Sequence, residues 1–489
     1  MGNVEVAWED VISVINMMRA HLIIIAAVLI AMIVVIIAVR KMERSKRRLF
    51  RVQSVLAFLL VTVITLNIAV TGTLYNTLNV VLADKGTLDP SHEENSKRVI
   101  EAVTDEGVVM TKNNDSFLPI ASQKINVFGW ASTNPIYGGT GSGTVDTTTA
   151  VGILQGLQNA GFETNSELSD MYVNYRADRP VISINNGQDW TLPEIPVADY
   201  PQEVLDRAKE FSDVAVLVFS RTGGEGTDLP EDMGPIMDGS TMEIGTKYTK
   251  GTYTNNSTKY DDFEAGRSYM ELSKTEEDLE DMVCGLFDNV IVVYNGSSVF
   301  ELGFAEKHEQ IKSLIWCPGT GQTGFEALGE ILAGEVNPSG KTTDILVKDL
   351  KETPSYNNFV VTPYDNMDEH GVTNAFNPEE LKVPSFANYV EGIYVGYRFY
   401  ETAAEEGLIN YDDTVLYPFG YGLSYTTFEQ SMGELQVSDD SISVDVTVTN
   451  TGDTAGKDVV ELYYNPPYYN GGIEKSSVNL AAFDKTGLL

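Results

Sequence analysis

Apolar runs and amphipathic segments alternate along the chain from about residue 91 to residue 425. Four runs are apolar over the length of a strand, which is typical of strands buried on both faces: residues 124–130, 213–221, 289–296 and 311–319. Four further segments have the spacing of helices that cover such a sheet: residues 147–161, 272–287, 297–307 and 324–340. The alternation predicts an α/β sandwich with a largely parallel sheet and helices on both faces.

Local signals mark the ends of two of these helices. Ser273 precedes a helix with Glu276 and Glu277 in its first turn, a pattern typical of an N-cap. Gly161 is expected to close the helix over residues 147–161, because glycine often ends helices.

The pattern changes near the C-terminus. Apolar Ile442, Val444, Val446 and Val448 alternate with polar residues, the sequence NTGD follows, and KDVVELYYN comes next. This predicts a half-buried hairpin and therefore a β-sandwich. Only about three or four strands fit before Leu489, whereas such a sandwich needs about seven, so we expect the domain to be incomplete.

The N-terminal region has the composition of a membrane anchor. Residues 20–39 contain no Asp, Glu, Lys or Arg, a second uncharged stretch runs from Val52 to Ala83, and seven basic residues lie in the segment RKMERSKRRLFR between them. About 20 apolar residues span a bilayer, and a basic loop faces the cytoplasm. We therefore expect two spans, at about 20–39 and 55–82, with the rest of the chain outside the cell. The alternatives are a cleavable signal peptide and two buried core helices.

Charge is distributed unevenly over the 489 residues. The chain has 33 Lys and Arg against 70 Asp and Glu, a formal net charge of −37, although residues 1–83 carry eight basic and four acidic residues. Such an acidic surface repels nucleic acid and anionic membranes. It suits a soluble domain that acts on neutral or cationic molecules.

Cysteine and histidine residues indicate no metal site. Cys284 and Cys317 are the two cysteines, and the four histidines show no metal-ligand spacing. We expect both cysteines to be buried free thiols.

Candidate chemistry lies in the sequence SRTGGEGTDLPED, residues 220–232, which follows a predicted strand. Ligands of such sheets bind beyond the carboxyl ends of the strands, and Glu225 is there surrounded by glycines. A partly desolvated carboxyl group has a raised pKa, which suits a general acid. The alternative is a glycine-rich surface turn.

A second glycine-rich loop, GGTGSGT at residues 138–144, also follows a predicted strand. It lacks the Gly-Lys-Ser/Thr ending of a phosphate-binding loop, so we interpret it as a loop that lines the same crevice. Asn256, Ser257 and Thr258 match the tripeptide of a glycosylation acceptor, which is common by chance.

Several segments resemble glycoside hydrolase family 3. SRTGGEGTDLP is similar to the family's acid/base loop, VTDEGVVMTKNNDSFLPI to its entry segment, and KINVFGW with the glycine loop to its first sandwich strand and pocket loop. GEILAGEVNPSGKTTDIL, YVEGIYVGYRFYETA and LYPFGYGLSYTTFE resemble its later motifs. VTVTNTGDTAGKDVVELYYNPPY resembles the first half of its fibronectin type III-like domain. Together these segments cover most of residues 91–489.

The resemblance implies a retaining β-glycosidase, β-glucosidase-like or β-xylosidase-like, that hydrolyses O-glycosidic bonds of oligosaccharides without a cofactor. Glu225 matches the acid/base position, and the implied substrate-binding residues are Gly139, Gly141, Ser142, Gly224 and Asp228. Two carboxyl groups about 5 Å apart allow double displacement.

The same resemblance divides the chain into three parts. These are a membrane anchor at 1–84, the α/β sandwich at 85–425, and an incomplete fibronectin type III-like domain at 426–489.

The order of modules departs from the commonest family pattern. That pattern begins with a (β/α)8 barrel that carries an aspartate nucleophile, and no barrel fits before the sandwich here. A permuted order would place the nucleophile beyond Leu489, so we expect the chain to be part of a longer enzyme and inactive alone. Asp189-Trp190 imitates the nucleophile dipeptide, but its flanks do not match.

The alternative function is a membrane-tethered carbohydrate-binding protein without catalysis. The sequence leaves open the sugar specificity, the choice between hydrolase and phosphorylase, and the oligomeric state.

Overall fold

The computed structural model describes most of the chain beyond residue 14. The described residues are 15, 17–75, 78, 89–176, 179–180, 182–183, 187–223, 229–238, 251–257, 261–358, 362–364, 366, 372–373, 381–382, 385–386 and 388–489. They form two compact units, Met1–Pro90 and Ser91–Leu489, which are considered separately.

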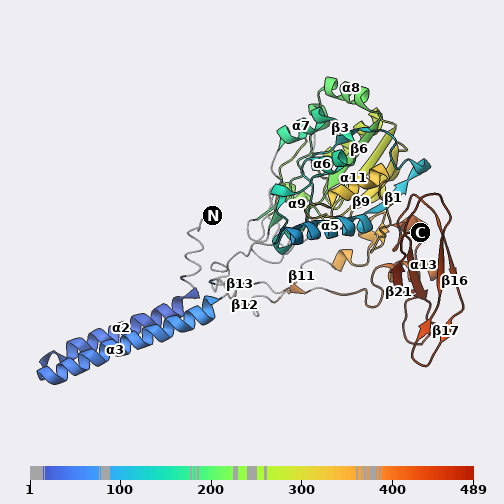
Figure 1. Ribbon diagram of the computed structural model, residues 1–489. Helices are drawn as coiled ribbons and strands as arrows, with labels where there is room; N and C mark the ends of the chain where they lie inside the picture. Colours follow the sequence, from blue (N-terminus) through green and yellow to red (C-terminus); the bar gives the residue numbers. More distant parts are fainter. Residues whose placement is uncertain are drawn as a thin grey trace. The chain divides into compact units, whose positions relative to one another are not determined.

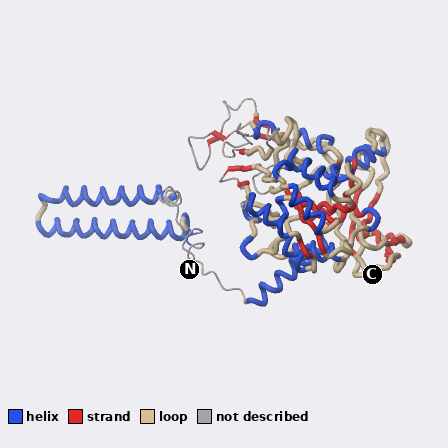
Figure 2. The backbone as a smooth tube through the Cα atoms, turned by 90° about the horizontal axis from the view of Figure 1, so that it is seen from above, coloured by secondary structure: helices blue, strands red, loops and turns tan. Residues whose placement is uncertain are grey.

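The first unit contains a pair of long helices. Helix α2 (Arg19–Ala38) is followed by a 3-10 turn (Val39–Lys41) and helix α3 (Arg44–Ile68), which ends in a π-helical turn (Ala69–Thr73). The two helices lie side by side as a hairpin (Figure 2). Both candidate spans, Arg19–Lys41 and Arg44–Thr73, are long and apolar enough to cross a membrane. Helix α3 begins at Arg44, before the expected span at 55–82, because the basic residues that precede this span are helical as well.

A six-stranded sheet forms the centre of the second unit (Figure 1), with the strand order β1-β9-β8-β6-β2-β3. All neighbours are parallel except β1, which runs antiparallel to β9. The strands are β1 (Val109–Asn113), β2 (Lys124–Phe128), β3 (Glu163–Thr164), β6 (Val214–Ser220), β8 (Asn289–Asn295) and β9 (Ile311–Cys317). The four predicted strands and the largely parallel sheet are thus confirmed, and β1 and β3 extend the two edges.

Alternate side chains of the sheet enter two hydrophobic cores. In β6, Ala215, Leu217 and Phe219 belong to one core, whereas Val216 and Val218 belong to the other. The first core includes side chains of α7 (Ser166–Tyr175), α8 (Gln202–Phe211) and α10 (Lys274–Leu286), and the second those of α6 (Ile153–Asn159) and α11 (Phe325–Ala333). Helices therefore cover both faces, which explains why the strands are continuously apolar.

Two predicted helix signals are confirmed. The Ser273 hydroxyl accepts a hydrogen bond from the Glu276 backbone N–H, and the Glu276 side chain accepts one from the Ser273 N–H, so a capping box starts α10. Gly161 follows the end of α6 (Ile153–Asn159) and its C-cap Ala160, and its φ of +90° is the left-handed conformation that glycine favours.

Three predicted helices are shorter than expected, and α11 ends at Ala333 although its segment was expected to extend to 340. The helix expected over 147–161 covers only α6, because the Asp146 carboxylate holds Thr147–Thr149 in a separate 3-10 turn. The segment 297–307 forms only a 3-10 helix, Leu302–Glu306. Phe300, Leu302 and Phe304 are all buried, and an α-helix would place side chains at this spacing of two on different sides.

The expected hairpin across NTGD does not form, which corrects that prediction. Strand β19 (Val446–Asn450) pairs with β16 (Phe428–Met432), and β20 (Val459–Tyr464) pairs with β21 (Asn479–Lys485). The Asn450 amide donates to the carbonyl oxygens of Thr454 and Leu489 and so holds the chain in a loop after β19. The half-buried alternation of Val444, Val446 and Val448 is nevertheless present.

Shorter elements complete the described part of the second unit. Its remaining helices are α5 (Pro90–Gly107), α9 (Gly234–Met237), α13 (Tyr397–Glu405) and α14 (Tyr411–Thr414). The remaining strands are β4 (Ile182–Ser183), β5 (Gly187–Asp189), β7 (Gly251–Thr252), β10 (Leu346–Val347), β11 (Thr362–Pro363), β12 (Val372–Thr373), β13 (Leu381–Lys382), β14 (Ser385–Phe386), β15 (Val415–Tyr417), β17 (Gln436–Val437) and β18 (Ile442–Ser443). Cys284 and Cys317 are buried free thiols, as expected.

Candidate functional site

The strand order creates a crevice at one end of the sheet. From β2 the chain first adds β3 on one side and then β6 on the other, so the connections leave in opposite directions. In open α/β sheets, ligands bind beyond the carboxyl ends of the strands at such a switch point. We therefore expect a ligand site at the loops after β2, β6 and β8.

Asn295, the last residue of β8, joins these loops. Its Oδ1 accepts a hydrogen bond of 2.6 Å from the Ile136 N–H, and its Nδ2 donates to the Ile136 and Cys317 carbonyl oxygens at 3.1 and 3.2 Å. Its own carbonyl oxygen accepts from the Arg221 N–H at 3.2 Å. The side chain is fully buried, so it fixes the loops after three strands. The sequence analysis missed this residue, although an Asn-Gly pair that ends a buried strand was a usable signal.

Glycines allow the loops to approach each other closely. A Cβ atom on Gly319 would lie 3.1 Å from the Gly138 Cα, and one on Gly138 would lie 2.7 Å from the Gly143 carbonyl oxygen. A Cβ on Gly139 would lie 3.7 Å from the Gly223 carbonyl oxygen, an ordinary contact. The two glycine-rich loops singled out in the sequence therefore meet at this edge.

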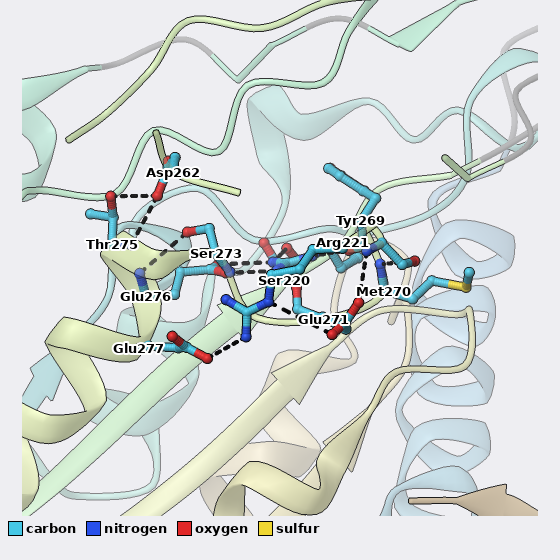
Figure 3. Close-up of polar contacts among 12 residues, drawn as sticks. Ser220, Arg221, Asp262, Tyr269, Met270, Glu271, Ser273, Thr275, Glu276 and Glu277 are labelled. Carbon is cyan, nitrogen blue, oxygen red and sulfur yellow. Dashed lines mark hydrogen bonds and ion pairs between the residues drawn. The ribbon is translucent and has the colours of Figure 1, made fainter. Parts of the chain in front are cut away.

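Arg221 anchors the start of the loop after β6 (Figure 3). Its guanidinium donates to both carboxylate oxygens of Glu276 and to the carbonyl oxygens of Ser220, Tyr269 and Glu271. Burial disfavours the charged guanidinium, yet the Glu276 carboxylate beside it leaves the pKa of Arg221 raised. Sequence reasoning missed this pair, because its members are 55 positions apart.

A cavity of about 690 Å³ opens beside these loops. Its walls come from the segments 136–139, 221–223, 229–231, 297–299, 344–356 and 391–400, with Met270. Three carboxyl groups, those of Glu231, Asp344 and Glu391, line it together with Tyr356, Tyr394 and Tyr400. Burial raises the pKa values of the Glu231 and Asp344 carboxyl groups. The volume and the mixed polar and aromatic walls suit a small organic ligand.

The predicted site residues differ in their position relative to the cavity. Gly139 lines the cavity, whereas Gly141 and Ser142 belong to a 3-10 turn, Gly141–Gly143. Gly224, Glu225 and Asp228 lie outside the described residues. The residues on either side of that segment, Gly223 and Leu229, both line the cavity.

Asp189, which imitates a nucleophile in the sequence, has structural partners. It ends β5, its Oδ1 accepts a hydrogen bond of 3.0 Å from the Thr191 N–H, and its Oδ2 lies 3.7 Å from the Arg176 Nη2. The adjacent Trp190 is fully buried in a small hydrophobic core. These contacts favour a structural role for the dipeptide.

Comparison with known proteins identifies the family. Residues 108–397 match the family model of the Glycosyl hydrolase family 3 C-terminal domain. The chain belongs to glycosyl hydrolase family 3. This match covers more than half of the 489 residues and includes β1 to β9, α6 to α11 and the cavity loops.

Similar proteins of this family include Beta-glucosidase A of Butyrivibrio fibrisolvens, which is 30% identical over 433 residues, or 84% of this chain and 46% of that protein. A Beta-glucosidase of Ruminococcus albus is 30% identical over 79% of this chain and 34% of its own length. The chain thus spans less than half the length of these relatives.

Solved structures have the same α/β fold. A beta-glucosidase from Paenibacillus barengoltzii is 28% identical with a TM-score of 0.61, over 80% of this chain and 36% of that one. Beta-glucosidase 3B from Thermotoga neapolitana, solved in complex with glucose, is 30% identical with a TM-score of 0.59, over 82% of this chain and 48% of that one.

Proposed function

We propose that the chain supplies the proton-donating part of a retaining β-glycosidase, with Glu225 as the general acid and base. One observation carries the proposal: Gly223 and Leu229, the residues on either side of the segment that contains Glu225, both line the cavity at the switch point of the sheet. Ligands of such sheets bind at this edge, which supports a catalytic role for the segment.

The reaction needs a second carboxylate, which attacks the anomeric carbon while Glu225 protonates the leaving oxygen. In the second step, Glu225 removes a proton from the water molecule that releases the sugar. The carboxyl group is thereby protonated again. We propose that residues outside this chain supply the nucleophile, since the matched relatives are about twice as long. By the same resemblance, we propose that 85–425 is the sandwich domain and 426–489 part of a fibronectin type III-like domain.

We further propose that residues 1–84 anchor the enzyme in the cell membrane and leave the catalytic part outside the cell. The support is the pair of helices long and apolar enough to cross a bilayer, with seven basic residues around the connection between them. A short loop rich in Lys and Arg faces the cytoplasm. The substrate is then an oligosaccharide or other β-glycoside at the cell surface.

The test is hydrolysis of aryl β-glucosides by the full-length gene product and its Glu225→Gln variant. We expect the variant to lose at least about a hundredfold in rate on a poor leaving group and much less on an activated one, because only the poor leaving group needs a proton. Azide should restore the rate on the activated substrate.

An exposed carboxylate on helix α8 provides the matched control, and Glu210→Gln should leave both rates unchanged. Equal rates of Glu225→Gln and the parent on the poor leaving group would contradict the proposal. Residues 1–489 alone should be nearly inactive, and rapid turnover by them would show that no outside nucleophile is required.

A further inference from the structure

Three carboxyl groups of the cavity wall have few partners: those of Glu231 and Glu391 belong to half-buried residues, and that of Asp344 belongs to an exposed residue. Among the described residues, the carboxylates of Glu231 and Glu391 have no hydrogen-bond or ion-pair partner, and that of Asp344 accepts only the Ile345 N–H, at 2.8 Å. Three acidic side chains therefore line one cavity with most of their lone pairs free.

No described cation of the cavity wall compensates this charge. Arg221 is the only Lys or Arg among the described residues that line the cavity, and its five N–H donors are occupied by Glu276 and by three carbonyl oxygens. The loop sequence from Thr222 to Asp238 contains five acidic residues and no Lys or Arg. Among the described residues of the wall, the three carboxyl groups are therefore not balanced by a free cation.

The arrangement does not fit a metal ion. Within the described parts of the chain, no three His, Cys, Asp or Glu residues come close enough to hold one. The carboxyl groups instead lie around a cavity of about 690 Å³, which is large enough for a sugar. A ligand that neutralises them must therefore carry its charge on an organic framework.

Tyr400 provides an independent sign of a ligand. Its side chain lines the cavity and is 2% exposed, yet among the described residues its hydroxyl has no hydrogen-bond partner. The hydroxyl oxygen is not among the fully enclosed unpartnered atoms of the described residues, so it is open to the cavity and can bond to a ligand or to water there. Tyr356 and Tyr394 add aromatic surface, which packs against sugar rings.

We propose that this cavity binds the leaving group of the substrate and selects it by charge, with preference for an amino sugar whose ammonium group the carboxylates of Glu231, Asp344 and Glu391 attract. The inference rests on the proposed function, because it assigns the cavity to the part of the substrate that Glu225 protonates. Neutral sugars bind less tightly, and sugars that carry a carboxylate or sulfate are excluded.

The test measures binding and does not require turnover. Calorimetry with the whole chain compares glucosamine, N-acetylglucosamine and glucuronate, which differ in charge on similar rings, in the presence of a chelator. We expect glucosamine to bind at least about tenfold more tightly than N-acetylglucosamine at low ionic strength, because one ion pair in a partly enclosed site is worth this much. Glucuronate should show no binding.

Variants that each remove one carboxylate test which residues cause the preference for glucosamine. Glu231→Gln and Asp344→Asn should each reduce the preference for glucosamine severalfold and leave N-acetylglucosamine almost unaffected, whereas the exposed control Glu264→Gln should change nothing. Thermal unfolding checks that the variants fold. Equal affinity for the three sugars, or a preference that survives both substitutions, would overturn the inference.

The two proposals can fail separately. If the charge preference is present while Glu225→Gln keeps full activity, the cavity assignment stands and the acid/base role is wrong. If Glu225→Gln is inactive but the three sugars bind alike, the acid/base role stands and the selection by charge is wrong.

Discussion

Arg221 and Glu276 form a buried bidentate ion pair that joins the end of β6 to the start of α10. Nη1 and Nη2 of Arg221 lie 2.8 and 2.6 Å from the two carboxylate oxygens, and the side chains are 0% and 6% exposed. Glu276 also caps α10 through the Ser273 N–H, 2.9 Å from its Oε2. One carboxylate thus holds both the strand end beside the cavity and the first turn of a helix.

Removal of this carboxylate should be strongly destabilising. We expect Glu276→Gln to lower the free energy of unfolding of residues 91–489 by about 3–5 kcal/mol, because Arg221 is left charged and buried. Urea denaturation measures the change.

An exposed pair supplies the matched comparison. Glu167 binds Arg207, whose Nε lies 2.8 Å from a carboxylate oxygen, but the two side chains are 41% and 49% exposed. Glu167→Gln should cost much less than Glu276→Gln, because water screens an exposed ion pair. Similar losses for the two variants would contradict the importance assigned to burial.

Glu280 should make stability depend on pH. It is fully buried in α10, both carboxyl oxygens lack a hydrogen-bond partner within the described part of the chain, and burial raises its pKa to about 8 from the ordinary 4.5. A raised pKa means that stability is complete below pH 4.5 and is lost as the pH rises through 8. At pH 7 the cost is about 3 kcal/mol.

Glu280→Met should therefore stabilise the protein, and the gain should increase between pH 5 and pH 8. Thermal unfolding across this range measures it, with the exposed Glu210→Met as the control that shows no pH-dependent gain. A gain that is the same at both pH values would contradict the raised pKa.

Two helical glycines should respond oppositely to alanine. A Cβ on Gly156 in α6 would lie 2.1 Å from the Phe325 carbonyl oxygen in α11, so Gly156→Ala must separate these helices. Gly285 in α10 has no atom within 4 Å of such a Cβ. We expect Gly156→Ala to destabilise by about 1–3 kcal/mol and Gly285→Ala to stabilise by about 0.5–1 kcal/mol. Denaturation midpoints decide the signs, and stabilisation by both would be inconsistent with close helix packing.

The proposed orientation in the membrane predicts which residues can be labelled from outside. Met42 lies between α2 and α3, and Asp453 is exposed in the second unit. Because Cys284 and Cys317 are buried, an impermeant maleimide should report only an introduced thiol. Met42→Cys should react only after the cells are opened, and Asp453→Cys should react in intact cells. Labelling of Met42→Cys in intact cells would exclude a cytoplasmic loop.

The sequence was sufficient to predict features whose physical cause lies in residues close together in the chain. A strand buried on both faces must be continuously apolar, so β6 and β8 could be found without the structure. The Ser273 cap depends on residues three positions apart. The motif around Glu225 could likewise be found from its order of residues. The hairpin predicted after Asn450 failed, because contacts with Leu489 and the pairing of β16 with β19 outweigh the local turn signal.

Tertiary structure alone decided what surrounds the candidate site. Asn295 and Ile136 are 159 positions apart, and Glu231 and Glu391 line one cavity although they are far apart in the chain. No periodicity encodes such contacts, because they arise only when the whole sheet has ordered its strands. The sequence by itself determined the family, the strands and the position of Glu225 in the chain. The fold decided that a buried Arg221–Glu276 pair and an acidic cavity lie next to that segment.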